Sequence, residues 1–233
     1  PAYCMYQGTG QSAGFSGHFV VHFDRPFTVY GVYNENERLQ SATQMDNKRE
    51  LGAYIGFKLD KGEALIVKTA SSFTSTDAAA RNLEVEIPDW DFDKVRVATE
   101  KRWNDHLSSI NIESENNDDK EMFYSALYRC SLLPRIYSDV DGTYPAFSLR
   151  DSIVHDPSFV YYDDFCAWDT YRALMPLVHL MNPEKGGDMV SSLVSKYVQG
   201  GWLPIFPCWN SYTSAMVGDH VIAMIGDAII KDI

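Results

Sequence analysis

Residues 161–172 read Tyr-Tyr-Asp-Asp-Phe-Cys-Ala-Trp-Asp-Thr-Tyr-Arg and lead into an apolar helical run. This short stretch combines large aromatic rings with carboxylates and an arginine. Aromatic faces can cover the C–H side of a sugar ring, while carboxylate and guanidinium groups hydrogen-bond its hydroxyls. The stretch therefore predicts a concave polar site with an aromatic floor, of the kind that holds a sugar. The alternative is structural: a buried Trp168 beside an aspartate that caps a helix.

The composition is that of a folded protein without a nucleic-acid partner. At 233 residues the chain can form one large domain or two modest ones around a sizeable core. A net charge of -12 argues against a nucleic-acid partner, because phosphate contacts need a basic surface. No apolar run has the length of a bilayer span, so we expect no membrane partner. Nothing at Pro1 resembles a signal peptide.

The cysteines are widely spaced. Cys4, Cys130, Cys166 and Cys208 form no CxxC pair, which excludes the usual zinc spacing and a dense disulfide framework. One or two bridges remain open, and buried free thiols are the favoured interpretation.

The first third of the chain alternates in the manner of antiparallel β-strands. Phe19, Val21 and Phe23 alternate with polar neighbours, which predicts a strand with one buried face. Further strands are expected at 27–33, 53–59 and 64–69, and a short one at Leu83, Val85 and Ile87. The turn at residues 60–63 is expected to join a hairpin. Strands at this spacing are typical of a β-sandwich or part of one.

The remainder reads as helices separated by aromatic loops. A helix that starts after Pro88 is expected to connect two domains, and helices are expected at 119–133, 168–181, 187–199 and 216–231. The long irregular segment 137–162 is of a kind that usually carries function. Its Asp139–Thr143 stretch favours a solvated turn over a calcium loop. Helix pairs wound into an α/α toroid would gather alternate loops at one end, where binding residues collect.

Three spaced motifs carry a family resemblance. Trp168-Asp169-Thr170-Tyr171-Arg172 is followed by Gly-Gly-Trp-Leu-Pro at 200–204 and by Met-Val-Gly-Asp-His at 216–220. In this order they resemble glycoside hydrolase family 92, whose members are calcium-dependent, inverting, exo-acting α-mannosidases, many of them α-1,2-mannosidases. The similarity extends over residues 27–233.

The resemblance implies an α+β multidomain fold. Residues 1–88 would be the C-terminal part of an antiparallel β-sandwich, 89–118 a linker helix and loop, and 119–233 the first half of an (α/α)6 toroid. The family's general acid, its general base and its main calcium ligands are expected beyond Ile233. We therefore assign no catalytic residue and no metal ligand, and expect this chain by itself to be inactive.

The resemblance also implies a substrate-binding set. Asp169 is the first choice for a contact to the terminal mannose, accepting hydrogen bonds from two hydroxyls; the alternatives are a helix cap or a partner of Arg172. The other members have structural alternatives. For Trp168 the alternative is a core ring, for Arg172 a clamp on an acidic residue, and for Trp202 a plug at a helix junction. For His220 it is hydrogen bonding to its neighbours. The set comprises Asp169, Trp168, Arg172, Trp202 and His220.

The expected activity is removal of terminal α-linked mannose from oligosaccharides with inversion, aided by Ca²⁺. The expected partners are a mannose-containing oligosaccharide and the missing remainder of the catalytic domain, and family members are commonly secreted or periplasmic. One alternative is a non-catalytic carbohydrate-binding or scaffold fragment, and another is a different (α/α)6 glycosidase.

Overall fold

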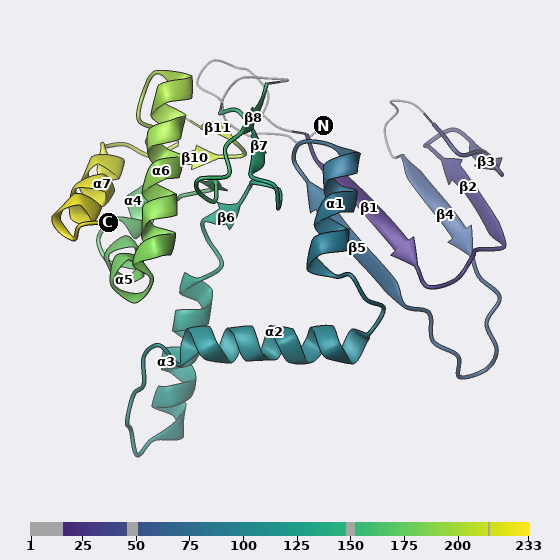
Figure 1. Cartoon of the computed structure of the whole chain (residues 1–233), viewed down its shortest axis with the longest axis horizontal. Helices are drawn as coiled ribbons and strands as arrows, with labels where there is room; N and C mark the ends of the chain where they lie inside the picture. Colours follow the sequence, from purple (N-terminus) through teal and green to yellow (C-terminus); the bar gives the residue numbers. More distant parts are fainter. Residues whose placement is uncertain (1–15, 46–50, 148–151, 214) are drawn as a thin grey trace. The chain divides into compact units, whose positions relative to one another are not determined.

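The computed structural model describes residues 16–45, 51–147, 152–213 and 215–233 (Figure 1). By internal contacts the chain divides into two units, Val21–Thr69 and the combined flanks Pro1–Val20 and Ala70–Ile233. The secondary structure mixes helices with small antiparallel sheets, as expected for an α+β chain. Within the described ranges, none of the helices combines the length and hydrophobicity that a bilayer span requires.

The smaller unit holds a three-stranded antiparallel sheet. Its order is β3 (Arg38–Gln40), β2 (Val29–Tyr33) and β4 (Gly52–Gly56). In the β2–β4 register, Gly31 faces Tyr54 and Tyr33 faces Gly52. A Cβ on Gly31 would lie 2.4 Å from the Tyr54 hydroxyl, and one on Gly52 would lie 2.3 Å from the Tyr33 ring. Glycine at both positions therefore lets each tyrosine ring lie across the neighbouring strand.

The expected hairpin at residues 60–63 is wrong, although the turn itself is present. The Glu63 amide donates to the Asp60 carbonyl at 3.0 Å, but β4 pairs with β2, whereas β5 (Val67–Ser72) pairs with β1 (His18–Phe23). The alternation at β1 correctly predicts a strand. It does not predict burial, because Phe19 and Val21 are exposed.

The expected strand at Leu83 to Ile87 is also wrong: this segment ends α1 (Thr76–Glu86). The Ser75 side chain caps that helix by accepting a hydrogen bond from the Ala78 amide at 3.0 Å. Its buried residues Ala79 and Leu83 are four apart and lie on one helical face, so the apolar spacing satisfies a helix as well as a strand.

Two helices follow. The connector α2 (Phe92–Leu107) is confirmed as a helix and is capped by Asp91, but none of its residues is buried. The next, α3 (Asn117–Cys130), is confirmed as a helix, and the Asn116 side chain caps it by accepting from the Asp118 amide. Its wide apolar stripe predicts burial against neighbours on both sides, and that is wrong, because Leu127 alone of its residues is buried.

The core of the larger unit lies among four helices and three short strand pairs (Figure 1). The expected helix 168–181 is split into α4 (Ala167–Thr170) and α5 (Leu174–Met181). It is followed by α6 (Pro183–Gly200) and, after a loop, α7 (His220–Ile230). The strand pairs are β6 (Arg135–Ile136) with β9 (Tyr162–Asp163), β7 (Thr143–Pro145) with β8 (Ile153–His155), and β10 (Pro207–Cys208) with β11 (Ser211–Tyr212). The buried cluster comprises Tyr162, Phe165, Ala167, Met175, Met189, Leu193, Val221 and Met224.

Candidate functional site

A fully buried ion pair lies beneath the segment that leads to Trp168. Asp163, in β9, has a carboxylate oxygen 3.3 Å from the Lys196 ammonium, and both side chains are completely excluded from solvent. Lys196 also donates to the Tyr162 carbonyl at 2.7 Å and lies 3.7 Å from the centre of the Tyr161 ring. Burial raises the pKa of Asp163 and lowers that of Lys196 to about 8, since each charged form loses its hydration.

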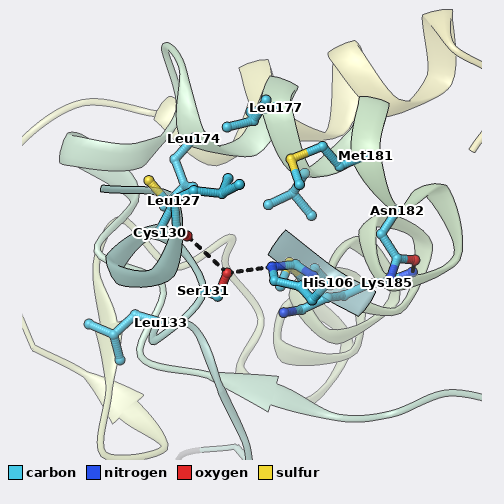
Figure 2. Close-up of a pocket in the computed structure, with 12 residues that line it drawn as sticks. His106, Leu127, Cys130, Ser131, Leu133, Leu174, Leu177, Met181, Asn182 and Lys185 are labelled. Atoms are coloured by element: carbon cyan, nitrogen blue, oxygen red, sulfur yellow. Dashed lines mark hydrogen bonds between the residues drawn. The ribbon is translucent and has the colours of Figure 1, made fainter. Parts of the chain in front are cut away.

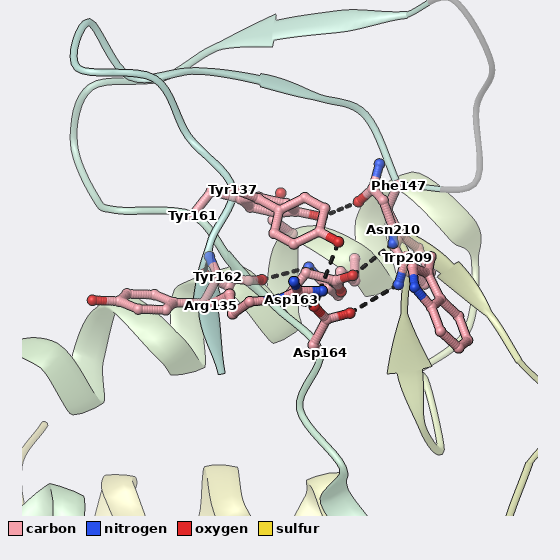
Figure 3. A network of polar contacts seen from close by, with 12 residues as sticks. Arg135, Tyr137, Phe147, Tyr161, Tyr162, Asp163, Asp164, Trp209 and Asn210 are labelled. Atoms are coloured by element: carbon pink, nitrogen blue, oxygen red, sulfur yellow. Dashed lines mark hydrogen bonds and ion pairs between the residues drawn. The ribbon is translucent and has the colours of Figure 1, made fainter. Parts of the chain in front are cut away.

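The neighbouring acid, Asp164, is satisfied from other directions. Arg135 donates to it from Nε at 2.6 Å and also pairs with it through a second guanidinium nitrogen. The Trp209 amide donates to its other oxygen at 2.9 Å. Asp163 and Asp164 are therefore occupied in holding the protein together, which removes both from the acids available to a sugar (Figure 3).

Asn210 connects this network to a third segment. Its backbone amide donates to Asp163 at 2.6 Å, and its side-chain amide donates to the carbonyls of Pro145 and Ala146. The Tyr161 hydroxyl donates to its side-chain oxygen at 3.0 Å, and Asn210 is fully buried (Figure 3). The aromatic loop around Trp209 is thus fixed against β9 at several points.

The two facing segments adopt backbone conformations that are uncommon for residues with side chains. Asp164 and Cys166 have φ values of 65° and 39°, and Trp209 and Asn210 have 53° and 55°. Such left-handed residues persist where surrounding contacts over-determine them, and they gather at functional sites. Here the carboxylate contacts of Asp163 and Asp164 supply that constraint.

Above the network, α4 presents Trp168 and Asp169 to solvent. Trp168 is 45% exposed and Asp169 is also exposed. The expected alternative of a buried core tryptophan is therefore wrong. The cap alternative for Asp169 is wrong as well, because Cys166 occupies the N-cap of α4 and Asp169 lies inside the helix. No hydrogen bond or ion pair to the Asp169 carboxylate is formed by the part of the chain that the structure describes.

The turn after α4 brings together Tyr171, Arg172 and His220. The His220 ring stacks on Tyr171 with centroids 4.2 Å apart and planes 14° apart. Arg172 donates from Nε to the Tyr171 hydroxyl at 2.7 Å. The expected clamp of Arg172 on Asp164 is wrong, since Arg135 occupies that role. Tyr171 is thus the residue that joins two predicted site residues.

Trp202 stands apart from this group. Its side chain is 77% exposed, and its backbone carbonyl and amide are both bonded to the Tyr212 hydroxyl. The structure gives the Trp202 ring no packing role among the described residues, which counts against a plug at a helix junction.

Several site-building residues were missed from the sequence, and one had a detectable signal. Lys196 lies on the buried face of α6, seven residues after Met189 and three after Leu193. A lysine in a helical apolar stripe indicates a buried charge with a partner. Arg135, Tyr171 and Asn210 gave no such signal, because their partners are distant in sequence or lie in irregular segments.

The described residues do not bring together the side chains of a metal site. Among them, no three His, Cys, Asp or Glu side chains gather closely enough to hold a metal ion. The expected solvated turn at residues 139–143 is in fact buried at Asp139, whose carboxylate accepts hydrogen bonds from Ser72 at 2.9 Å and Asn82 at 2.7 Å, and from Thr74. This carboxylate is a structural link between the α1 region and the turn.

A small cavity lies elsewhere in the larger unit (Figure 2). Its volume is about 20 Å³, roughly the space of one water molecule. His106 reaches the Ser131 hydroxyl at 2.7 Å beside it, and burial lowers the pKa of His106. The cavity is too small for a sugar ring. It is lined by His106, Leu127, Cys130, Ser131, Leu133, Leu174, Leu177, Val178, Met181, Asn182, Lys185 and Met189.

Known proteins resemble this chain along most of its length. The profile of the glycosyl hydrolase family 92 catalytic domain matches residues 78–233. An uncharacterized secreted glycosidase of Arthroderma benhamiae is 32% identical over 128 residues, covering 52% of this chain and 15% of that protein. An inverting mannosidase of family GH92 from Bacteroides thetaiotaomicron is 30% identical with a TM-score of 0.82, covering 93% of this chain and 29% of that one.

A second GH92 α-mannosidase of that bacterium, solved with mannoimidazole, is 28% identical with a TM-score of 0.82, over 93% of this chain and 29% of that one. The chain therefore spans less than a third of the relatives it matches. The resemblance carried by the three motifs is confirmed: the chain belongs to glycosyl hydrolase family 92.

Proposed function

We propose that the protein is an inverting α-mannosidase that removes terminal α-linked mannose, with α-1,2-linked oligosaccharides as the substrate class. Residues 161–220 would then contribute one wall of its sugar-binding site. Two relatives of similar fold are mannosidases by name, and one was solved with a mannose-like ligand, which supports the choice of sugar.

One observation carries this assignment. Asp169 is an exposed acid beside the exposed Trp168 ring, and both are held on α4 above the buried Asp163–Lys196 pair. A rigid base beneath an exposed aromatic and an uncommitted carboxylate suits a sugar, whose C–H face stacks on the ring while its hydroxyls bond the acid. Arg172 and His220, joined through Tyr171, would supply further polar contacts, and Trp202 a second aromatic face.

Among the residues that the structure describes, no acid–base pair for the reaction is evident. Inversion requires two carboxyl groups about 6.5–9.5 Å apart, one to protonate the leaving oxygen and one to activate water. Asp163 and Asp164 are adjacent and engaged by Lys196 and Arg135. We therefore assign no catalytic residue here and expect the 233-residue chain alone to be inactive. Calcium belongs to the proposal for the longer enzyme, where it would assist in distorting the sugar and placing the water.

The finer architecture is part of the same proposal. The strands before residue 88 would belong to a β-sandwich, α2 to a linker over 89–118, and α3 to α7 to the first half of an (α/α)6 toroid. The name of the Arthroderma relative supports a secreted enzyme.

The test uses a longer polypeptide that contains this chain and the remainder of the family domain. We expect it to release mannose from α-1,2-linked mannobiose in the presence of calcium, with the β-anomer detected first by NMR. Asp169→Asn should lower kcat/KM by about 10- to 100-fold, because charged hydrogen bonds to the sugar are lost. The exposed position predicts no change in thermal stability.

The control is Asp105→Asn, an exposed acid on α2 whose partner is Lys101. It should leave kcat/KM unchanged. Equal activity of the Asp169 variant and the parent would overturn the role of Asp169. Mannoside binding without turnover in the longer polypeptide would instead favour a non-catalytic carbohydrate-binding protein.

A further inference from the structure

Two segments that carry the site are clasped together along their lengths. Asp163 accepts from the Asn210 amide at 2.6 Å, and Asp164 accepts from the Trp209 amide at 2.9 Å. Next along the chain, the Phe165 amide donates to the Pro207 carbonyl at 3.1 Å. The two segments therefore run beside each other in opposite directions, and the residues that follow Phe165 and Pro207 both adjoin this hydrogen bond, which we call the junction.

Each segment places a cysteine at that junction. Cys166 follows Phe165, has a φ of 39° and caps α4, while Cys208 follows Pro207 in β10. Cys208 is 8% exposed and Cys166 is half-buried. The two thiols interact with each other, and each shifts the pKa of the other. The two cysteines therefore lie close to each other where the two segments meet.

We propose that Cys166 and Cys208 are a modification site: under oxidising conditions they form a disulfide that locks α4 to the aromatic loop around Trp209. A bridge requires neighbouring Cα positions, and the Phe165–Pro207 hydrogen bond supplies that proximity. This inference does not rest on the proposed activity, since its readout involves no sugar.

The two thiols have distinct chemical roles. The interaction with Cys208 lowers the pKa of the Cys166 thiol, so Cys166 is the better nucleophile and is reachable from solvent. The same interaction, together with burial, raises the pKa of Cys208. Cys208 is therefore the resolving thiol.

The reaction balances with oxidised glutathione as the oxidant. The Cys166 thiolate attacks a glutathione sulfur, forming a mixed disulfide and expelling one glutathione thiolate. Cys208 then loses its proton to solvent and attacks the Cys166 sulfur, expelling the second glutathione. The two protein sulfurs are oxidised to one disulfide, and one glutathione disulfide is reduced to two thiols.

The experiment equilibrates the whole chain with defined ratios of reduced and oxidised glutathione. Free thiols are trapped with N-ethylmaleimide, and tryptic peptides are identified by mass spectrometry. The relevant peptides are separate, because Cys166 lies in 151–172, Cys208 in 197–231 and Cys130 in 130–135. We expect the first two to become linked as oxidant rises, with a joint loss of their maleimide adducts, while Cys130 stays alkylated.

Matched variants sharpen the result. Cys208→Ser should trap the glutathione adduct on Cys166, whereas Cys130→Ser should leave the Cys166–Cys208 link unchanged. The parent chain supplies the decisive reading even if a variant folds poorly. Alkylation of both cysteines at every glutathione ratio, a persistent glutathione adduct in the parent chain, or linkage to Cys130 or Cys4 would each overturn the proposal.

Discussion

Lys196 is the residue on which the interior of the site depends. Its ammonium is fully buried and touches three groups of the 161–163 segment: the Asp163 carboxylate, the Tyr162 carbonyl and the Tyr161 ring. A buried ion pair contributes little net stability compared with an apolar replacement, but removing one partner leaves an uncompensated charge. The two members must therefore be treated as a unit.

We predict that Lys196→Met lowers the free energy of unfolding by about 3–5 kcal/mol, because Asp163 remains buried without its partner. Urea denaturation followed by circular dichroism measures the change. The double variant Lys196→Met with Asp163→Asn should recover part of the loss, since the uncompensated charge is gone.

Lys185→Met is the matched control in the same helix. Lys185 is half-buried, and no carboxylate pairs with it among the described residues. Its replacement should change stability much less. A Lys196 variant as stable as the Lys185 variant would contradict the buried pair.

At this scale the sequence predicts residue types better than their roles. In the stretch 161–172 Trp168 and Asp169 are exposed, and their role in a concave sugar site stays a prediction. The ion pairs of Asp163 and Asp164 were not visible in this stretch, because Lys196 and Arg135 lie about 30 residues away and are brought in by the fold. Hydrophobic periodicity shows which face of a helix or strand is apolar, but it does not show which charged side chains form pairs.

Among the elements, α5, α6 and α7 are joined by close contacts at single residues. Gly186 of α6 approaches α5 so closely that a Cβ there would lie 2.6 Å from the His179 ring. His179 in turn bonds Asp227 of α7 at 2.6 Å, and Asp227 also pairs with Lys231. The order of the three helices depends on this line of contacts.

We predict opposite effects of alanine at two adjacent glycines of α6. Gly186→Ala should destabilise the chain by about 1–3 kcal/mol, since the new methyl group meets the His179 ring. Gly187→Ala, whose Cβ would meet Ile233 at an ordinary 3.6 Å, should be neutral or about 1 kcal/mol more stable through helix propensity. Thermal unfolding of the two variants provides the comparison, and equal effects would refute the close α5–α6 packing.

Acidic pH should weaken the contact between α5 and α7 that His179 and Asp227 form. The hydrogen bonds from Lys231 and then His179 hold the pKa of Asp227 below its usual 3.8, because they favour the ionised form. The unfolded chain takes up the proton at a higher pH than the folded chain. The stabilisation is therefore complete above about pH 4 and is lost as pH falls through the lowered folded-state pKa.

Asp227→Asn measures this contribution directly. Relative to the parent, the variant should lose stability at neutral pH, and the difference should shrink as the pH falls below 4. A difference that is constant from pH 7 to pH 2 would show that ionisation of Asp227 is not involved.

Elements were predicted correctly where one interpretation fits the spacing. Helices α2 and α3 and strands β2 and β4 of the small sheet followed from local chemistry, whereas β3 lies in a stretch where no strand was expected. Helix α1 was misread because Leu83, Val85 and Ile87 alternate like the residues of a strand. Ala79 lies on the same helical face as Leu83, but its small side chain contributes little to a hydrophobic pattern. The break between α4 and α5 was missed because residues 171–173 carry no glycine or proline.

For the whole molecule, the apolar surface of the last helices is the outstanding feature. Large apolar side chains on α5, α6 and α7 are strongly exposed: Leu180, Val198, Ile222, Ile229 and Ile230. Exposed apolar surface of this kind marks a contact with other protein, and in the proposed architecture the remainder of the toroid would cover it.

We predict that the purified chain associates with itself and binds the dye ANS, because this surface lacks a cover. Sedimentation velocity over a range of concentrations reports the association. Co-expression with the remainder of the family domain should suppress both effects. A compact, monodisperse monomer that does not bind ANS would contradict the incomplete-toroid interpretation.

The family was recognisable from three motifs because their order and spacing are specific. The arrangement of sheets and helices around these motifs was not recognisable from local patterns, because such patterns do not show which segments distant in sequence pack together. The pairing of Asp163 with Lys196 and of Asp164 with Arg135 emerged only from the structure.

The central claim is that the described residues form one wall of a mannose site and do not include the acid–base pair. The most direct measurement incubates the purified chain with α-1,2-linked mannobiose, first with calcium and then with EDTA, and quantifies released mannose. We predict no release from the chain alone under either condition, and calcium-dependent release from the longer polypeptide. Calcium-dependent release by the chain alone would place a working pair of carboxyl groups within these residues and contradict the claim.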